Sequence, residues 1–158
     1  MRRHIQAATL PLWTMVKLKI LSMNVRGLNA NLKRVKCLEL MHRVDVDVVL
    51  IQESHLSQDN ISKRQNKHFK VISSSSGDSS CKGVIILFKR SLPLKIERIG
   101  NDKAGRLAYV CTSIFGSKVA FVCVYAPSIY DKNFYPNLTT FFTAKLWRHF
   151  LNYQVVPC

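Results

Sequence analysis

Three apolar runs along this chain each end on a polar side chain. The runs cover residues 18–24, 46–53 and 119–125, and their polar ends are Asn24, Glu53 and Tyr125. Apolar runs of this length predict strands. Up to Gln52 the second run is interrupted only by Asp47, as expected of a strand covered on both faces. If the three strands end side by side in one sheet, an amide, a carboxylate and a phenol converge at one rim, where open α/β sheets hold their sites.

A helix is predicted between the first two runs, over residues 31–43. Apolar residues recur there every three positions, on one face, at Leu32, Val35, Leu38 and Met41. Asn29 or Asn31 is expected to cap the first turn, because an Asn side chain accepts hydrogen bonds from free backbone N–H groups.

Later segments predict further strands joined by polar turns. Residues 68–73 form a weak strand pattern, and the serine-rich segment 73–80 predicts a turn or loop. Four more strands are expected at residues 83–88, 94–99, 106–114 and 118–125. Gly116-Ser117 predicts a tight hairpin turn between the last two, because Gly accepts the positive φ that such turns require.

Short motifs occupy the ends of the apolar runs in a fixed order. Ser-Met-Asn-Val-Arg-Gly-Leu-Asn covers 22–29, Ile-Gln-Glu-Ser-His covers 51–55 and Val-Tyr-Ala-Pro covers 124–127, with Lys-Gly-Val-Ile-Ile-Leu at 82–87 between them. Each string alone recurs by chance, but their order at strand ends is a specific joint signal. Together they resemble the endonuclease/exonuclease/phosphatase superfamily, most closely the endonuclease domain of LINE-type non-LTR retrotransposons.

The resemblance implies an α/β fold, namely a two-sheet α/β sandwich of the endonuclease/exonuclease/phosphatase (DNase I-like) type. It covers residues 15–144, so that residues 1–14 are expected to be an unstructured extension and residues 145–158 an unrelated tail. Abasic-site endonucleases and exonuclease III are similar too, but they usually carry an acid where this chain has Arg26, and a Lys after their Gln-Glu-Thr string where it has His55. Both departures favour the retrotransposon branch.

The resemblance also implies roles for individual residues. Glu53 corresponds to the metal-holding glutamate, since carboxylate oxygen is the ligand that magnesium prefers; manganese is an alternative ion. Asn24 and Tyr125 are the expected catalytic groups at the scissile phosphate. By residue type alone, a solvent-facing Glu, a turn-forming Asn and a half-buried aromatic remain alternatives. Residues expected to contact DNA are Arg26, Asn29 and His55.

Parts of the family's catalytic centre have no counterpart in this sequence. The family completes its site with a Gly-Asp-Phe-Asn string and a late Asp-His pair, whereas residues 132–158 contain no Asp or Glu. We therefore expect the C-terminal half of the fold to be missing, with few strands of the second sheet, an uncovered apolar sheet face and little or no nicking activity. The alternatives are a catalytically dead, basic nucleic-acid-binding fragment and an abasic-site or exonuclease III-like repair nuclease.

Charge and composition favour a polyanionic partner. The 158 residues form one domain's length and carry 24 Lys and Arg against 9 acids, a net charge of +15. Such an excess favours DNA as the partner, in the nucleus of the cell, because counterion release drives binding to phosphate backbones. No apolar stretch approaches the ~20 residues of a membrane span, and no obligate protein partner is evident. The five Cys lack zinc-site spacing, and we expect Cys111 and Cys123 to pack as reduced thiols.

Overall fold

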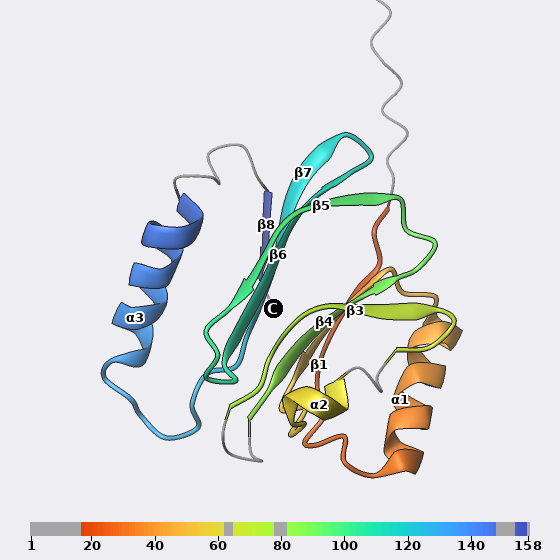
Figure 1. The fold of residues 1–158 in the computed structure, drawn as a ribbon, viewed down its shortest axis with the longest axis horizontal. Helices are drawn as coiled ribbons and strands as arrows, with labels where there is room; N and C mark the ends of the chain where they lie inside the picture. The colour runs from red at the N-terminus through yellow and green to blue at the C-terminus, as the bar shows by residue number, and fades with distance from the viewer. Residues whose placement is uncertain (1–16, 62–64, 78–81, 148–153, 158) are drawn as a thin grey trace, which may run out of the picture.

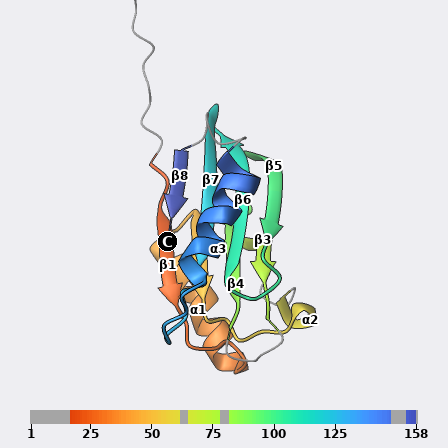
Figure 2. The same cartoon turned by 90° about the vertical axis from the view of Figure 1, so that its left-hand side faces the viewer.

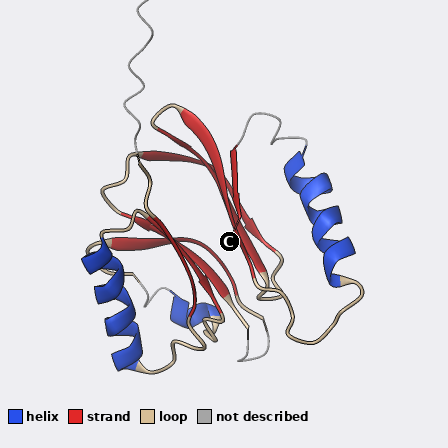
Figure 3. Ribbon diagram, turned by 180° about the vertical axis from the view of Figure 1, so that it is seen from behind, coloured by secondary structure: helices blue, strands red, loops and turns tan. Residues whose placement is uncertain are grey.

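The computed structural model describes residues 17–61, 65–77, 82–147 and 154–157, with backbone only at 145–147 and 154–157. The predicted extension at 1–14 lies outside the described residues, and so do residues 78–80 of the predicted loop at 73–80. Residues 73–75, predicted as part of that loop, instead belong to a strand. Two four-stranded sheets pack face to face, and helices cover the outer face of each (Figure 1). Viewed from behind, the helices again lie outside the two layers of strands (Figure 3).

The first sheet, sheet A, has the strand order β1-β2-β4-β3. Its strands are β1 (Ile20–Asn24), β2 (Val48–Gln52), β3 (Phe69–Ser75) and β4 (Val84–Lys89). β1 and β2 run parallel and are joined through α1 (Asn31–Val44), whereas β4 is antiparallel to both β2 and β3. The short helix α2 (Gln58–Ile61) lies between β2 and β3 in the sequence. β1 and β2 therefore end at the same rim of sheet A.

The second sheet, sheet B, has the strand order β5-β6-β7-β8. Its strands are β5 (Leu94–Asn101), β6 (Leu107–Ile114), β7 (Ser117–Val124) and β8 (Gln154–Pro157). The first three form an antiparallel meander, and β8 pairs parallel to β7. α3 (Phe134–Phe141) continues into η2 (Phe142–Trp147) and crosses the outer face of this sheet (Figure 2).

Alternation along β2 explains why its sequence is apolar on both sides. Val49 and Ile51 pack in the core between sheet A and α1, whereas Val48 and Leu50 pack in the core between the two sheets. In the inter-sheet core the rings of Phe88 and Phe121 meet edge to face with centroids 5.2 Å apart. The prediction that this strand is covered on both faces is thus confirmed.

The second sheet is more complete than the sequence led us to expect. We predicted few strands of it and an uncovered apolar face, but sheet B has four strands, and its buried residues face sheet A on one side and α3 on the other. Across the outer interface the rings of Tyr109 and Phe141 lie edge to face, 5.7 Å apart. That expectation was wrong because β5 to β8 form a sheet that covers the inner face of sheet A, while α3 covers the outer face of sheet B.

The helix predicted at residues 31–43 forms at Asn31–Val44, but its buried face and cap differ from the prediction. Cys37 and Met41 are buried, whereas Leu32 is 66% exposed. The reason is geometric: a strict period of three falls short of the 3.6-residue turn, so Leu32 lies about 180° around the axis from Met41. The N-cap is Ala30, and no side chain caps the helix.

Other boundaries shift by one to three residues. The hairpin turn between β6 and β7 is formed by Phe115 and Gly116, with φ of 49° and 80°, rather than by Gly116-Ser117. Cys111 and Cys123 are buried in strands as predicted, and burial raises the pKa of the Cys111 thiol. In the described part of the chain, no helix is both long and apolar enough to cross a membrane.

Two histidine rings stack where the end of α1 meets the start of β3. The ring centroids of His42 and His68 are 3.8 Å apart and nearly parallel, at 18°. Burial lowers the pKa of the His68 imidazole, and the positive charges of His42, Lys67 and Lys89 lower it further. These surroundings therefore favour the neutral form of His68.

Candidate active site

The ends of the parallel strands β1 and β2 bring Asn24 and Glu53 together. Asn24 pairs with Gln52 in the ladder, and Glu53 follows directly. The Asn24 amide Nδ2 donates a hydrogen bond of 2.6 Å to Glu53 Oε1, while its Oδ1 accepts the backbone N–H of Arg26 at 3.1 Å. The amide is therefore fixed from both sides, and it holds the carboxylate in one orientation. This is the convergence that the sequence predicted for two of the three strand ends.

His55 lies on the other side of the same carboxylate. Its Nε2 is 3.7 Å from Glu53 Oε2, and its side chain is 24% exposed. A Cβ on Gly27 would come within 2.9 Å of His55 Nδ1, so the ring rests on that glycine. The residue predicted to contact DNA is thus built into the surroundings of Glu53, where it can form an ion pair when protonated.

The backbone at this rim adopts conformations that side-chain-bearing residues rarely take. Arg26, Glu53 and His55 have φ of 45°, 53° and 55°, in the left-handed region. Such residues typically cost about 1–3 kcal/mol each and concentrate at functional sites, because the surrounding structure must hold them in place. Three of the six predicted site residues carry this strain.

Backbone hydrogen bonds connect the rim loops across both sheets. The N–H groups of Gly27 and Leu28 donate to the carbonyls of Glu53 and Ser54, at 2.7 and 2.9 Å. Ser54 in turn donates to Gly83, and Gly83 donates to Gly105, at 2.9 and 3.0 Å. The strained turn at Glu53 is therefore held by partners that are far away in the sequence.

Ser54 and Gly83 are site-supporting residues that the sequence reasoning missed. Ser54 is fully buried, and its hydroxyl has no hydrogen-bond partner among the described residues. A Cβ at Gly83 would lie 2.3 Å from Ser54 Oγ, so the serine occupies the space that a side chain at Gly83 would need. A glycine at the start of a strand pattern was the available signal, because it marks a close approach of backbone.

Tyr125 comes from the other sheet, which corrects the expectation that all three strands end in one sheet. β7 belongs to sheet B, and Tyr125 follows it. The sheets are nevertheless in contact near this end: Gln52 Nε2 donates to Cys123 Sγ at 3.4 Å, and Cys123 Sγ donates to the carbonyl of Ile51 at 3.3 Å. Face-to-face packing, rather than strand pairing, therefore brings the end of β7 next to the end of β2.

Arg106 is a third residue that the sequence reasoning missed. Its carbonyl accepts the Tyr125 N–H at 2.8 Å, and its guanidinium lies 5.8 Å from the centre of the Tyr125 ring.

Asn29, predicted to contact DNA, is exposed on the loop before α1, and its carbonyl accepts Arg34 Nη1 at 2.5 Å. Arg26 is exposed as well, and its carbonyl accepts Lys33 Nζ at 3.1 Å.

The donors at the rim fit a magnesium ion only in part. The Glu53 carboxylate is a hard oxygen ligand of the kind that magnesium takes. However, no cluster of three or more His, Cys, Asp or Glu side chains suited to a metal ion occurs among the described residues. A single carboxylate fits a weakly held ion whose remaining ligands are water molecules.

Solved structures share this fold, although no protein-family model matches the sequence. Mannosyl-6-phosphatase Bt3783 of Bacteroides thetaiotaomicron aligns with a TM-score of 0.64 at 13% identity, over 89% of this chain and 64% of that one. D. rerio TDP2 complexed with a single-strand DNA product gives 0.62 at 18% identity, over 89% and 58%. The endonuclease domain of TRAS1, a telomere-specific non-LTR retrotransposon, gives 0.59 at 13% identity, over 89% and 58%.

These likenesses confirm the predicted fold. The chain has the two-sheet α/β sandwich of endonuclease/exonuclease/phosphatase proteins, the name carried by a further similar structure from Bacteroides thetaiotaomicron with a TM-score of 0.62. It spans between 58% and 64% of the length of the three structures above. At these identities the comparison establishes the fold, and the roles of individual residues remain predictions.

Proposed function

We propose that this chain binds DNA at the rim formed by the ends of β1, β2 and β7, and that this rim is a phosphodiesterase-type site with little or no turnover. The observation that carries the proposal is the 2.6 Å hydrogen bond between Asn24 and Glu53 at the ends of two parallel strands. It presents an oriented carboxylate beside an amide, in a chain of net charge +15.

Basic residues around the rim support DNA as the partner. Arg26 and Lys33 lie on the loop and first turn that follow β1, Lys82 precedes β4, and Arg106 precedes β6. The segments that carry them are connected through the rim loops, since the carbonyl of Lys82 accepts the His55 N–H at 3.0 Å. Lys and Arg placed around a phosphate site attract the backbone of DNA and make the binding sensitive to salt.

The proposed roles follow the chemistry of each side chain. Glu53 would hold magnesium, or manganese, and Asn24 would keep its carboxylate oriented. The bound ion would neutralise phosphate charge and lower the pKa of a bound water. Tyr125 would donate its hydroxyl to a phosphate oxygen, and Arg26, Asn29 and His55 would contact the strand. Hydrogen-bond donors aimed at the phosphate stabilise the charge that develops there.

Turnover requires a group that deprotonates the attacking water, and the Asp of the family's late Asp-His pair has no counterpart in residues 132–158. Residues 132–158 contain no Asp or Glu, and a missing general base alone typically lowers the rate by roughly 10²–10⁴. We therefore expect binding without efficient nicking.

Nicking of DNA, as the resemblance to retrotransposon endonucleases implies, is the second candidate function and is favoured by the Asn24–Glu53 geometry. Repair of abasic sites is weakened by Arg26, which stands where an acid is usual.

Two assays on the purified chain test the proposal. Fluorescence anisotropy with a duplex oligonucleotide should show binding that weakens steeply as salt rises. Supercoiled plasmid at millimolar magnesium should stay supercoiled, with and without chelator. Chelator-sensitive nicking that disappears in Glu53→Gln would instead establish the endonuclease activity, and an absence of salt-sensitive binding would refute the DNA-binding role. A DNA partner also implies a nuclear location, which imaging of a tagged chain would test.

A further inference from the structure

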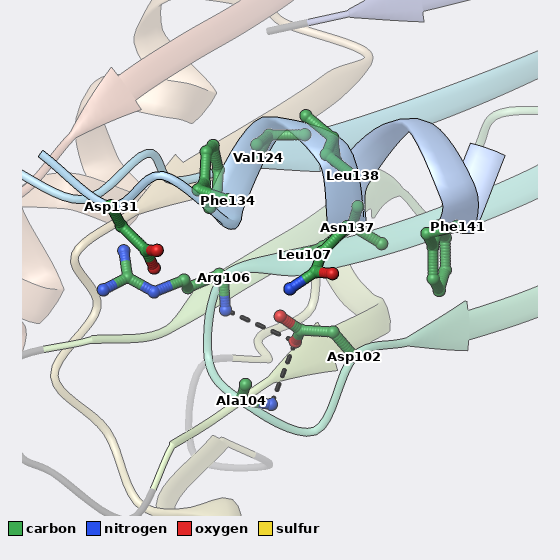
Figure 4. A pocket seen from close by; sticks show the side chains of 10 residues that line it. All are labelled: Asp102, Ala104, Arg106, Leu107, Val124, Asp131, Phe134, Asn137, Leu138 and Phe141. Atoms are coloured by element: carbon green, nitrogen blue, oxygen red, sulfur yellow. Dashed lines mark hydrogen bonds between the residues drawn. The ribbon is translucent and has the colours of Figure 1, made fainter.

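A pocket opens beside the rim, between α3 and the outer face of sheet B. Its volume is about 300 Å³. Leu107 and Val124 form its floor, and Phe134, Leu138 and Phe141 of α3 form its wall (Figure 4). Small-molecule sites have volumes upward of about 300 Å³ and mainly apolar walls, so this pocket is the size for one compact ring system rather than a long chain.

Polar groups gather at one end of this pocket, around Arg106. The Arg106 guanidinium lies 5.8 Å from the centre of the Tyr125 ring and 5.9 Å from that of Phe134. It donates to the Tyr125 carbonyl at 3.4 Å and forms no ion pair within the described part of the chain. A half-buried guanidinium held between aromatic rings is suited to stack on a base or to grip a phosphate.

Two carboxylates also line the pocket, and both are engaged by neighbouring backbone. Asp102 Oδ1 accepts the Ser75 hydroxyl at 2.6 Å and the N–H groups of Ala104 and Arg106 at 3.0 and 3.4 Å (Figure 4). Asp131 Oδ1 accepts the Asn133 N–H at 2.9 Å. The remaining polar group is the exposed Asn137 side chain, whose amide offers both a donor and an acceptor.

The pocket lies within reach of a strand bound at the candidate active site. Backbone hydrogen bonds run from Ser54 to Gly83 and from Gly83 to Gly105, the residue before Arg106. Hydrogen-bonded backbones lie ~4.8 Å apart, so these two steps separate Ser54 from Gly105 by at most roughly 10 Å. Gly105 stands between Ala104 and Arg106, which both line the pocket. That distance corresponds to about three stacked nucleotides at ~3.4 Å each.

We propose that this pocket receives one unstacked base of the DNA strand whose phosphate lies at Asn24 and Glu53. The inference rests on the proposed DNA-binding function. Apolar and aromatic walls replace the stacking partners that the base loses, Arg106 stacks on it or binds its phosphate, and the Asn137 amide hydrogen-bonds its edge. The basic rim selects a nucleic acid over an uncharged ring compound.

The test uses a single-stranded oligonucleotide in which one nucleotide at a time is replaced by an abasic analogue. Anisotropy with the parent chain should show a loss of affinity at one position, or two adjacent ones, of roughly 5- to 150-fold, the effect of one base–aromatic contact. Equal, small losses at every position would overturn the proposal. If the chain shows no salt-sensitive binding at all, the DNA-binding function is refuted together with the base pocket. If it binds DNA without position dependence, only the base pocket is refuted.

Matched variants assign the effect to the pocket. Leu138→Trp should fill the cavity and abolish the position dependence, while Thr139→Trp, on the exposed side of the same helix, should keep it. Arg106→Gln should weaken binding and lower the slope of log affinity against log salt by about 0.7. Position dependence that persists unchanged in a folded Leu138→Trp chain would place the base elsewhere and overturn the proposal.

Discussion

Replacing Gly83 by Ala tests how the rim is held together. Gly83 has φ of +128°, a conformation that L residues rarely adopt. The added Cβ would lie 2.3 Å from Ser54 Oγ and 3.5 Å from the backbone nitrogen of His55. Because Ser54 is fully buried, its side chain cannot swing out into water to make room.

The expected loss of stability has two parts. Holding an alanine in a glycine-only conformation costs about 1–3 kcal/mol. Forcing an extra methyl group into packed surroundings costs a further ~1–3 kcal/mol. Together they give a loss of about 2–6 kcal/mol, a large part of the ~5–15 kcal/mol that stabilises a typical domain.

Gly116→Ala is the matched control, because Gly116 has φ of +80° and nothing within 4 Å of the added Cβ. It should show only the conformational cost. Urea unfolding followed by far-UV circular dichroism measures both variants, with equal slopes showing that the transition midpoint reports stability. Ser54→Gly in the Gly83→Ala background should recover part of the loss. A Gly83→Ala chain no less stable than Gly116→Ala would refute the reasoning.

Three further predictions concern the rim and the stacked histidines. Arg26→Gly should keep or slightly raise the free energy of unfolding, because glycine adopts the φ of 45° without strain. It should also lower the slope of log affinity for duplex DNA against log salt concentration by about 0.9. An unchanged slope in a salt titration would exclude Arg26 as a phosphate contact. In the presence of chelator, Glu53→Gln should bind DNA several-fold more tightly than the parent chain, because roughly 1 kcal/mol of repulsion between the Glu53 carboxylate and the DNA phosphates is removed. If Glu53 holds magnesium, adding the ion should reduce the difference in affinity between the two chains. The pKa of His68 is lowered in the folded state, so the unfolded chain binds a proton at this residue at a higher pH than the folded chain does. The contribution of neutral His68 to stability is therefore present above about pH 6.5 and is lost as the pH falls below that value. His68→Asn should flatten the dependence of the unfolding midpoint on pH between about 5 and 7, and an unaltered profile would show that the stack with His42 is not acid-sensitive.

Local pattern was enough to predict the strand ends that carry the site. The apolar run ending on Glu53 predicts a strand buried on both faces, because such burial makes consecutive residues apolar, whereas the run ending on Asn24 forms a partly exposed edge strand. The motif order then indicated the endonuclease/exonuclease/phosphatase fold, which the similar solved structures confirm. The two residues do meet, with a hydrogen bond of 2.6 Å. Their chemical roles remain predictions.

Contacts between distant residues decided what the sequence could not. Periodicity reports which positions are buried but not which strand pairs with which, so it could not show that Tyr125 belongs to the second sheet or that α3 covers that sheet. The left-handed backbone of Glu53 depends on hydrogen bonds from Gly27 and on the loop that runs on to Gly83. Such a conformation is unfavourable for the isolated segment and exists only where tertiary partners impose it. The sequence alone determined which side chains stand at the ends of the strands, and only the packing of two sheets and their rim loops decided which of them face one another.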